Sequence, residues 1–350
     1  MRFYPNIENY NRGMNNRETV LKLKISNKRK VKILLYNIVV MFCSPQIGSE
    51  FDRIYFVNGK SQEYFNLDLE NITKISHGNV YTNAKQFFLK PTLYSIYNRW
   101  ERIAILFNAI KIYKKNKIKI GDFSSWFEYV VLEYFMHDAA FNEIIARGHY
   151  DEYATWIGLL AEEKLFKYSI FQHGVEVDDV KVRSKIFCNN LFAFDKYSIE
   201  IFKKNIIKNE SCNYFLHDFP PSVLFESIVR TSDLFYIGIA EQCNKDWINR
   251  ILKILSGVQG ICIILMLHPL SREKYKKDSR IIMTDKKILN IDLLITENST
   301  LTLDYYRKRK DIRIIYTSVD SYNTFSEYPF ILCETEKEII PLIMKGMKND

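Results

Sequence analysis

Apolar residues along the chain fall into short continuous runs that are separated by longer amphipathic stretches. Residues 234–240 and 261–267 are almost wholly apolar, which is typical of buried strands. Between them, apolar side chains recur at helical spacing, at Trp247, Ile248, Ile251, Leu252 and Leu255. Gly257 follows and is suited to a helix C-terminus. The pattern predicts a strand–helix–strand unit.

The same alternation continues towards the C-terminal end. Further strands are predicted at 280–285, 291–296 and 311–317. After the second of these, Asn298, Ser299 and Thr300 are suitable N-terminal caps for a helix. A last helix is expected to begin at the capping box Thr335-x-x-Glu338 and to kink at Pro341.

The first half shows the alternation more loosely. Strands are predicted at 141–148, 168–172 and 191–195, and helices at 125–136, 151–166 and 198–204. The first of these helices opens with the capping box Ser125-x-x-Glu128. Alternating strands and helices indicate an α/β protein with parallel, doubly wound sheets.

The length of 350 residues allows two domains. The Asp-Phe-Pro-Pro-Ser stretch at 218–222 is predicted to be the hinge between them. This gives an N-terminal domain over 1–218 and a C-terminal domain over 223–350.

Composition limits the kinds of binding partner and the cellular compartment that can be expected. A formal net charge of +9 favours an anionic partner: a nucleic acid, a nucleotide-activated substrate or an acidic membrane surface. The six cysteines show no C-x-x-C spacing, which indicates reduced thiols and no structural zinc. The best apolar run, 31–43, is too short to span a bilayer, and the N-terminus has no apolar signal core. A cytoplasmic protein is therefore expected.

Polar side chains that could bind a ligand or take part in catalysis follow four of the predicted strands. They are His149-Tyr150-Asp151, His173-Gly174, His268-Pro269 and Glu297-Asn298-Ser299-Thr300. Ligands of open α/β sheets bind outside the carboxyl ends of the strands. We therefore expect these four ends to line one crevice between the domains.

The residue types fit group transfer from a nucleotide. A departing phosphate needs hydrogen-bond donors, which helix N-terminal amides, the hydroxyls of Ser299 and Thr300, and His268 supply. The attacking hydroxyl needs a base. The candidates for that base are His173, Glu176, Asp178 and Asp179. His149 and Asp151 either orient a loop or join the catalytic group.

Three of these motifs carry a resemblance to a known family. Gln-His-Gly at 172–174, His-Pro at 268–269 and Glu-x-Ser-Thr at 297–300 resemble motifs of bacterial surface-polysaccharide glycosyltransferases of the GT-B fold. The His-Gly is similar to that of CDP-glycerol glycerophosphotransferases of teichoic acid synthesis. The His-Pro and Ser/Thr motifs are similar to those of bacterial sialyl- and polysialyltransferases. The resemblance covers roughly 140–320.

The resemblance implies two Rossmann-like domains that face a central cleft, with the N-terminal domain on the acceptor side and the C-terminal domain binding the nucleotide donor. His268, Pro269, Ser299 and Thr300 would contact the donor phosphate, and Glu297 would reach the ribose. His173 would be the base. The acidic-acidic-Gly motif that carries the base in sialyltransferases is absent, since 176–179 lacks the glycine. This leaves Asp151 and Asp178 as further candidates for the base and leaves the donor nucleotide open.

The implied function is a metal-independent, inverting transfer without a cofactor. A sugar would move from a nucleotide donor, with a CMP-sugar favoured, to a glycan or lipid-linked glycan acceptor in the synthesis of capsule, lipopolysaccharide or a related surface polysaccharide. One alternative is a CDP-polyol phosphotransferase of teichoic-acid type, and another is a catalytically silent scaffold.

A nucleic-acid-binding protein is the alternative from a different class. The basic residues are spread along the chain and no recognised binding signature is present, so we expect no nucleic-acid partner. The basic tracts 22–32 and 111–119 are either solvated faces or contacts with the anionic inner leaflet of a membrane, where the protein would be peripheral.

Overall fold

The computed structural model describes most of the chain in separate stretches. These are residues 4–20, 53–56, 92–116, 123–147, 151–172, 174, 180–217, 223–241, 244–268, 271, 275, 278–297, 299–317 and 325–348, with single positions between 31 and 46. They belong to two compact units. Unit 1 comprises Met1–His173, Asp179–Phe194 and Ile199–His217, and unit 2 comprises Gly174–Asp178, Asp195–Ser198 and Asp218–Asp350.

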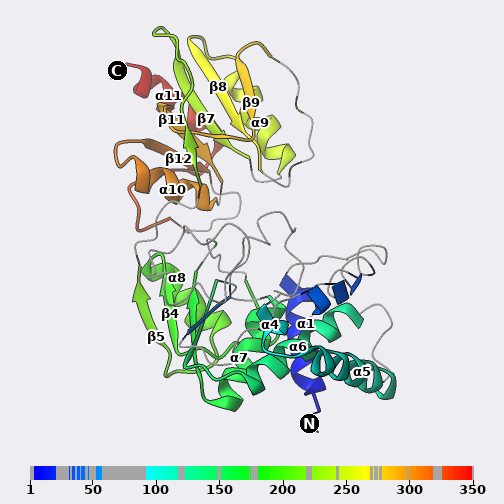
Figure 1. Cartoon of the computed structure of the whole chain (residues 1–350). Helices are drawn as coiled ribbons and strands as arrows, with labels where there is room; N and C mark the ends of the chain where they lie inside the picture. Colours follow the sequence, from blue (N-terminus) through cyan, green and yellow to red (C-terminus); the bar gives the residue numbers. More distant parts are fainter. Residues whose placement is uncertain are drawn as a thin grey trace. The chain divides into compact units, whose positions relative to one another are not determined.

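Unit 2 is built on a six-stranded sheet (Figure 1). Its strands are β7 (Phe235–Ala240), β8 (Ile261–Met266), β9 (Ile281–Thr284), β11 (Leu293–Thr296), β12 (Arg313–Thr317) and β13 (Ile331–Cys333). They lie in the order β13-β12-β11-β7-β8-β9, and every neighbouring pair is parallel. A small parallel pair, β6 (Phe225–Glu226) with β10 (Lys287–Ile288), is separate from this sheet.

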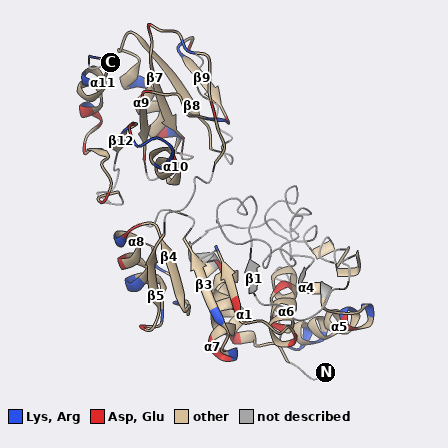
Figure 2. Cartoon of the chain, turned by 60° about the vertical axis from the view of Figure 1, so that its left-hand side comes forward, with Lys and Arg blue, Asp and Glu red and all other residues tan. Residues whose placement is uncertain are grey.

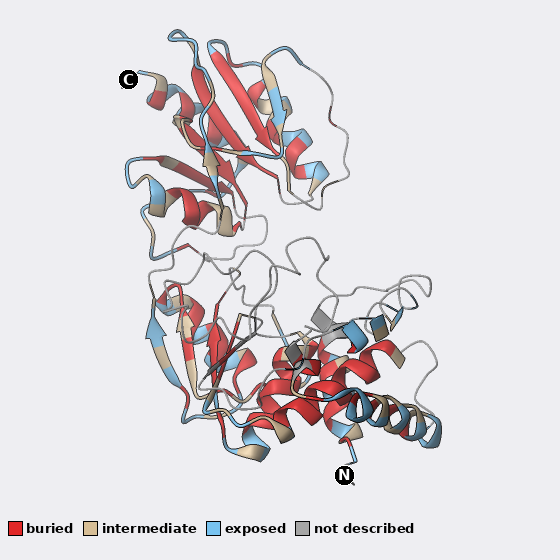
Figure 3. Ribbon diagram, in the orientation of Figure 1, coloured by how far each residue is buried: buried red, intermediate tan, exposed pale blue. Residues whose placement is uncertain are grey.

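Helices cover both faces of the sheet in unit 2. They are α9 (Lys245–Leu255), α10 (Thr300–Lys308) and α11 (Ile339–Met347). Alternate residues of β7 point to opposite faces: Ile237 packs in one core with Trp247 of α9, and Tyr236 packs in the other with Tyr305 of α10. The central strands are therefore buried on both sides, as Figure 3 shows, which explains why their sequences are continuously apolar.

Unit 1 contains a five-stranded parallel sheet in the order β1-β2-β3-β4-β5. Its strands are β1 (Arg53–Phe56), β2 (Glu143–Ala146), β3 (Lys167–Phe171), β4 (Asn190–Ala193) and β5 (Asn213–Leu216). Its helices are α1 (Ile7–Val20), α4 (Thr92–Ser95), α5 (Arg99–Lys115), α6 (Phe123–Asp138) and α7 (Glu152–Lys164), with a π-helical turn at Phe202–Ile206. Helix α8 (Lys196–Ile201) is divided between the two units, since Lys196–Ser198 belong to unit 2.

The core of unit 1 is rich in aromatic side chains. Helix α6 is buried from Ser124 to Met136. Trp126 lies edge-on to Tyr10 of α1, and Trp156 of α7 stacks on the same ring. Each large aromatic side chain buries much apolar surface, so these few rings contribute strongly to the packing of α1, α6 and α7.

The prediction of an α/β chain with parallel sheets is confirmed, but three local predictions are wrong. Helix α6 begins at Phe123, because that ring packs on Phe127 and Tyr113, and Ser125 lies buried inside the helix. Ser256 is the C-cap of α9, and Gly257 after it does not have the positive φ of a left-handed cap.

The last helix also differs from the expected one. Thr335 precedes a 3-10 turn at Glu336–Glu338, and its hydroxyl donates to the carboxylate of Glu338 at 3.0 Å instead of capping the backbone. Pro341 lies in the first turn of α11, and the kink expected there stays a prediction. A missing N–H costs no intrahelical bond at that position.

The predicted hinge at 218–222 lies outside the described residues. Among the helices that the structure does describe, none has the length and apolar character that crossing a bilayer requires.

Candidate functional site

The order of strands in unit 2 changes direction at β7. From β7 the chain adds β8 and then β9 on one side, and it later places β11 and β12 on the other side. The loop after β7 leads to α9 and the loop after β11 leads to α10, which cover opposite faces of the sheet. Ligands of open α/β sheets bind at such a switch point, outside the carboxyl ends of the strands.

The side chain of Asn244 bridges the two loops at this switch point. Asn244, after β7, accepts a hydrogen bond from the backbone N–H of Trp247 at 3.2 Å and so caps α9. Its Nδ2 donates to both carboxylate oxygens of Glu297, after β11, at 3.1 and 3.3 Å. Glu297 is buried. The two loops are therefore held together where a ligand of this fold binds.

Glu241 organises the segment that follows β8. This carboxylate directly follows β7 and is 2% exposed. It accepts hydrogen bonds from the backbone N–H of His268 at 2.7 Å and from the hydroxyls of Ser271 and Tyr275 at 3.0 Å each. Hydrogen bonds to a charged acceptor are the strong ones, so Glu241 fixes where His268 lies.

His268 is half-buried at the carboxyl end of β8. Burial lowers the pKa of its imidazole, Lys287 lowers it further, and the charge of Glu241 opposes both. The ammonium of Lys287 donates to the backbone carbonyl of Leu267 at 2.8 Å, and burial lowers its pKa as well. The lowered pKa favours the uncharged imidazole at neutral pH, and this form carries one ring N–H as a hydrogen-bond donor.

Ser299 and Thr300 lie at the N-terminus of α10. The Ser299 hydroxyl accepts from the backbone N–H of Leu301 at 3.2 Å and so caps the helix, and Thr300 is its first residue. Ser299 is buried and Thr300 is partly exposed. The end of the helix offers N–H groups and a positive dipole end, which together suit an anion.

The structure brings four of the predicted residues to one edge of one sheet. His268 follows β8, and Glu297, Ser299 and Thr300 follow β11, on the two sides of β7. Two strand spacings separate these ends by about 10 Å. That distance is comparable to the length of a nucleotide.

Asp151 has a structural role in unit 1. It caps α7, and its Oδ1 accepts from the backbone N–H of Ala154 at 2.7 Å. His173, Asp178 and Pro269 lie outside the described residues, as do His149 and Tyr150. The expectation that the four strand ends share one crevice stays a prediction.

Glu241 and Asn244 were not among the residues predicted from the sequence. The signal was available, because Glu241 directly follows the apolar run 234–240, as His268 follows 261–267. The same rule of strand ends applied to this third strand identifies both residues.

Within the described part of the chain, no group of three or more His, Cys, Asp or Glu side chains could hold a metal ion. The arrangement at the strand ends of unit 2 is one of hydrogen-bond donors and carboxylates.

Comparisons with known proteins give weak structural likenesses. No family model matches the chain, and no curated protein matches it. A crystal structure of the GtfA/B complex is similar over 63% of this chain and 53% of that chain, with a TM-score of 0.39 and 9% identity. A structure of the wall teichoic acid polymerase TagF is similar over 91% of this chain and 80% of that chain, with a TM-score of 0.34 and 11% identity. At these values neither match assigns an activity.

Proposed function

We propose that this chain is a metal-independent glycosyltransferase that binds its nucleotide-sugar donor at the carboxyl edge of the sheet in unit 2. The observation that carries the proposal is the switch point between β7 and β11, where the Asn244 side chain donates to the carboxylate of Glu297 beside the N-terminus of α10. Doubly wound sheets bind nucleotides in this position.

The donor phosphate would lie at the N-terminus of α10. The backbone N–H groups and the hydroxyl of Thr300 donate to its oxygens there, and Ser299 keeps the first turn in place. His268 adds a hydrogen bond from an uncharged ring. Glu297 accepts hydrogen bonds from the ribose hydroxyls, and Glu241 is a positioning residue that holds His268.

The transfer is a direct displacement with inversion. The acceptor hydroxyl oxygen forms a bond to the anomeric carbon, and the bond from that carbon to the phosphate oxygen breaks. The nucleotide leaves with the electron pair, and a base takes the hydroxyl proton. His173 is the predicted base and Asp178 a further candidate, while Asp151 is the weaker candidate because it already caps α7.

The His-Pro and Glu-x-Ser-Thr motifs favour a CMP-sugar as donor. A glycan or lipid-linked glycan of capsule or lipopolysaccharide type is the proposed acceptor. A CDP-polyol phosphotransferase would use the same donor site, with attack on phosphorus instead of carbon.

Nucleotide binding tests the proposal. Thermal shifts and calorimetry with CMP, CDP, UDP and GDP should show one preferred nucleotide, because a ligand that binds only the folded state raises its stability. His268→Ala should weaken that binding and reduce turnover by about 100-fold, in line with the loss of a donor to a leaving group.

The matched control is His137→Ala, which removes an exposed histidine of unit 1 that pairs with Asp138. Full activity of His268→Ala, or no stabilisation by any nucleotide, would overturn the assignment. Hydrolysis of CDP-glycerol in preference to CMP-sugars would instead identify the phosphotransferase.

A further inference from the structure

Helix α5 of unit 1 has two faces of opposite character. Its inner face carries the buried residues Arg102, Ile105, Ala109 and Ile112. It contacts α6, where the indole N–H of Trp126 donates to the backbone carbonyl of Ala109 at 3.0 Å. This face fixes the helix on unit 1.

The outer face of α5 exposes large apolar side chains. Trp100 is 80% exposed and Phe107 is 66% exposed. They lie two turns apart, on the side of the helix opposite the inner face. Figure 3 shows the exposed side running along the helix. Exposing these two rings to water costs free energy, and a helix face that exposes large apolar side chains is a candidate interaction site.

Basic residues continue the same face at the C-terminal end of the helix. Lys111 and Lys114 follow Phe107 at helical spacing, and Lys115 lies beside them; all three are exposed. Figure 2 shows this basic end of α5. The outer face, defined here by Trp100, Phe107, Lys111, Lys114 and Lys115, thus combines two rings with three positive charges.

We propose that the outer face of α5 binds an anionic lipid surface, with the helix lying in the plane of the headgroups. Trp is the side chain most typical of the membrane–water interface, because its ring is apolar and its N–H is polar. The lysines would contact anionic headgroups, and their long aliphatic stems allow this while the rings insert. The 17 residues of α5 give a contact about 25 Å long.

The charge of the face selects lipid over a second copy of the chain. Two such faces each carry three lysines and so repel one another overall, whereas an anionic bilayer complements all three lysines at once. The inference does not depend on the proposed transfer reaction, because α5 carries none of the proposed donor-binding residues.

Tryptophan fluorescence gives a direct test. The chain has four Trp, and Trp126, Trp156 and Trp247 are all fully buried, so Trp100 is the one that solvent reaches. Vesicles with phosphatidylglycerol should shift its emission to the blue, and brominated lipid should quench it. Pure phosphatidylcholine vesicles should do so much less, and added salt should weaken the effect.

Variants separate the contribution of the lysine charges to vesicle binding from that of the two rings, as measured by co-sedimentation with vesicles. Lys111→Gln, Lys114→Gln and Lys115→Gln together should lower the association constant by about 100-fold, or about fivefold per lysine. Trp100→Ala with Phe107→Ala should lower it by about tenfold or more. Neither change should lower the melting temperature much, because the side chains are exposed.

Matched controls come from exposed residues of unit 2. Lys253→Gln, Lys337→Gln and Lys345→Gln remove the same charge, and Leu224→Ala with Val229→Ala removes exposed apolar side chains; both should leave binding nearly unchanged. The proposal fails if phosphatidylglycerol vesicles do not bind, if they bind without the blue shift of Trp100, or if the control lysines matter equally. A dimer that Trp100→Ala dissociates would assign the face to a second copy instead.

Discussion

Glu133 is a buried carboxylate in the middle of α6. It accepts a hydrogen bond from the backbone N–H of Asn6, with N–O distances of 3.0 and 3.3 Å to its two oxygens. Burial raises its pKa to about 7, although hydrogen bonds from Tyr129 and Asn6 act in the opposite direction. In the folded protein this group therefore holds a proton over a pH range in which the unfolded chain has released it.

The raised pKa of Glu133 predicts that the stability of unit 1 depends on pH. Between about pH 4.5 and pH 7 the folded state binds more protons than the unfolded state, so the free energy of unfolding falls as the pH rises through this window. The pKa difference between the folded and unfolded states corresponds to a change of about 3 kcal/mol in the free energy of unfolding. Glu133→Gln should remove that part of the pH dependence, because the amide keeps an acceptor for Asn6 and does not titrate.

Urea unfolding at pH 5 and pH 7.5, followed by tryptophan fluorescence, measures the effect as the difference between wild type and variant. The matched control is Glu200→Gln, an exposed carboxylate paired with Lys203, which should leave the pH dependence unchanged. An identical pH profile for wild type and Glu133→Gln would refute the prediction.

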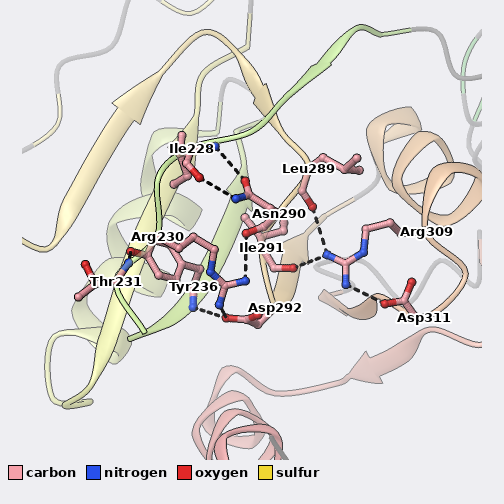
Figure 4. Close-up of polar contacts among 10 residues, drawn as sticks. All are labelled: Ile228, Arg230, Thr231, Tyr236, Leu289, Asn290, Ile291, Asp292, Arg309 and Asp311. Carbon is pink, nitrogen blue, oxygen red and sulfur yellow. Dashed lines mark hydrogen bonds and ion pairs between the residues drawn. The ribbon is translucent and has the colours of Figure 1, made fainter. Parts of the chain in front are cut away.

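At the scale of elements, the polar groups at the two edges of the sheet in unit 2 differ in their proposed roles. At the amino ends of β7 and β11, polar groups bind one another (Figure 4): Arg230 pairs with Asp292 at 2.6 Å, and Asp292 also accepts from the backbone N–H of Tyr236 at 2.7 Å. Asn290 exchanges two hydrogen bonds with the backbone of Ile228. This edge holds the segment before β7 in place, whereas the carboxyl edge carries the proposed donor site.

Substitutions at the two edges should therefore separate stability from binding. Arg230→Ala should lower the stability of unit 2 by about 1–2 kcal/mol, since it removes a hydrogen-bonded ion pair, and leave nucleotide affinity unchanged. Ser299→Ala should cost about 1 kcal/mol as a lost cap and also weaken nucleotide binding. Thr300→Val should weaken binding alone.

Denaturant titrations and nucleotide calorimetry on the three variants test this pattern. Equal loss of affinity in Arg230→Ala and Thr300→Val would show that the effect on binding is a general consequence of destabilisation, not of a site at α10.

At the scale of the whole molecule, the proposed donor site lies within a single unit. The residues proposed to bind the nucleotide all follow strands of unit 2. Nucleotide without acceptor should therefore slow amide hydrogen exchange in the segments after β7, β8 and β11, and leave the strands of unit 1 unchanged. Mass spectrometry of peptides from both units measures this. Protection confined to unit 1 would contradict the assignment.

Tertiary structure also decides which cysteines meet. The six cysteines are scattered in the sequence, yet the thiols of Cys188 and Cys212 lie 3.4 Å apart, buried in unit 1 before β4 and β5. No spacing rule predicts this contact, because it follows from the parallel pairing of β4 with β5.

The sequence by itself determined strands β7, β8, β9, β11 and β12 and helices α9 and α10 of unit 2 to within a few residues, but it did not predict β6, β10 or β13. Continuous apolar runs, helical spacing and the Ser299 cap act over short distances along the chain, so they can be recognised without coordinates. It also placed His268, Glu297, Ser299 and Thr300 at strand ends. Where flanking packing overrode a local signal, as Phe123 did for Ser125, the sequence prediction was wrong.

Only the tertiary structure decided which strand ends are neighbours. The insertion of β7 between β8 and β11 sets Glu241 beside His268 and brings Asn244 to Glu297, 53 residues away along the chain. Strand order depends on which buried faces match across long loops, and no local pattern carries that information. For that physical reason the residue types at several strand ends were readable from the sequence, whereas their arrangement relative to one another was not.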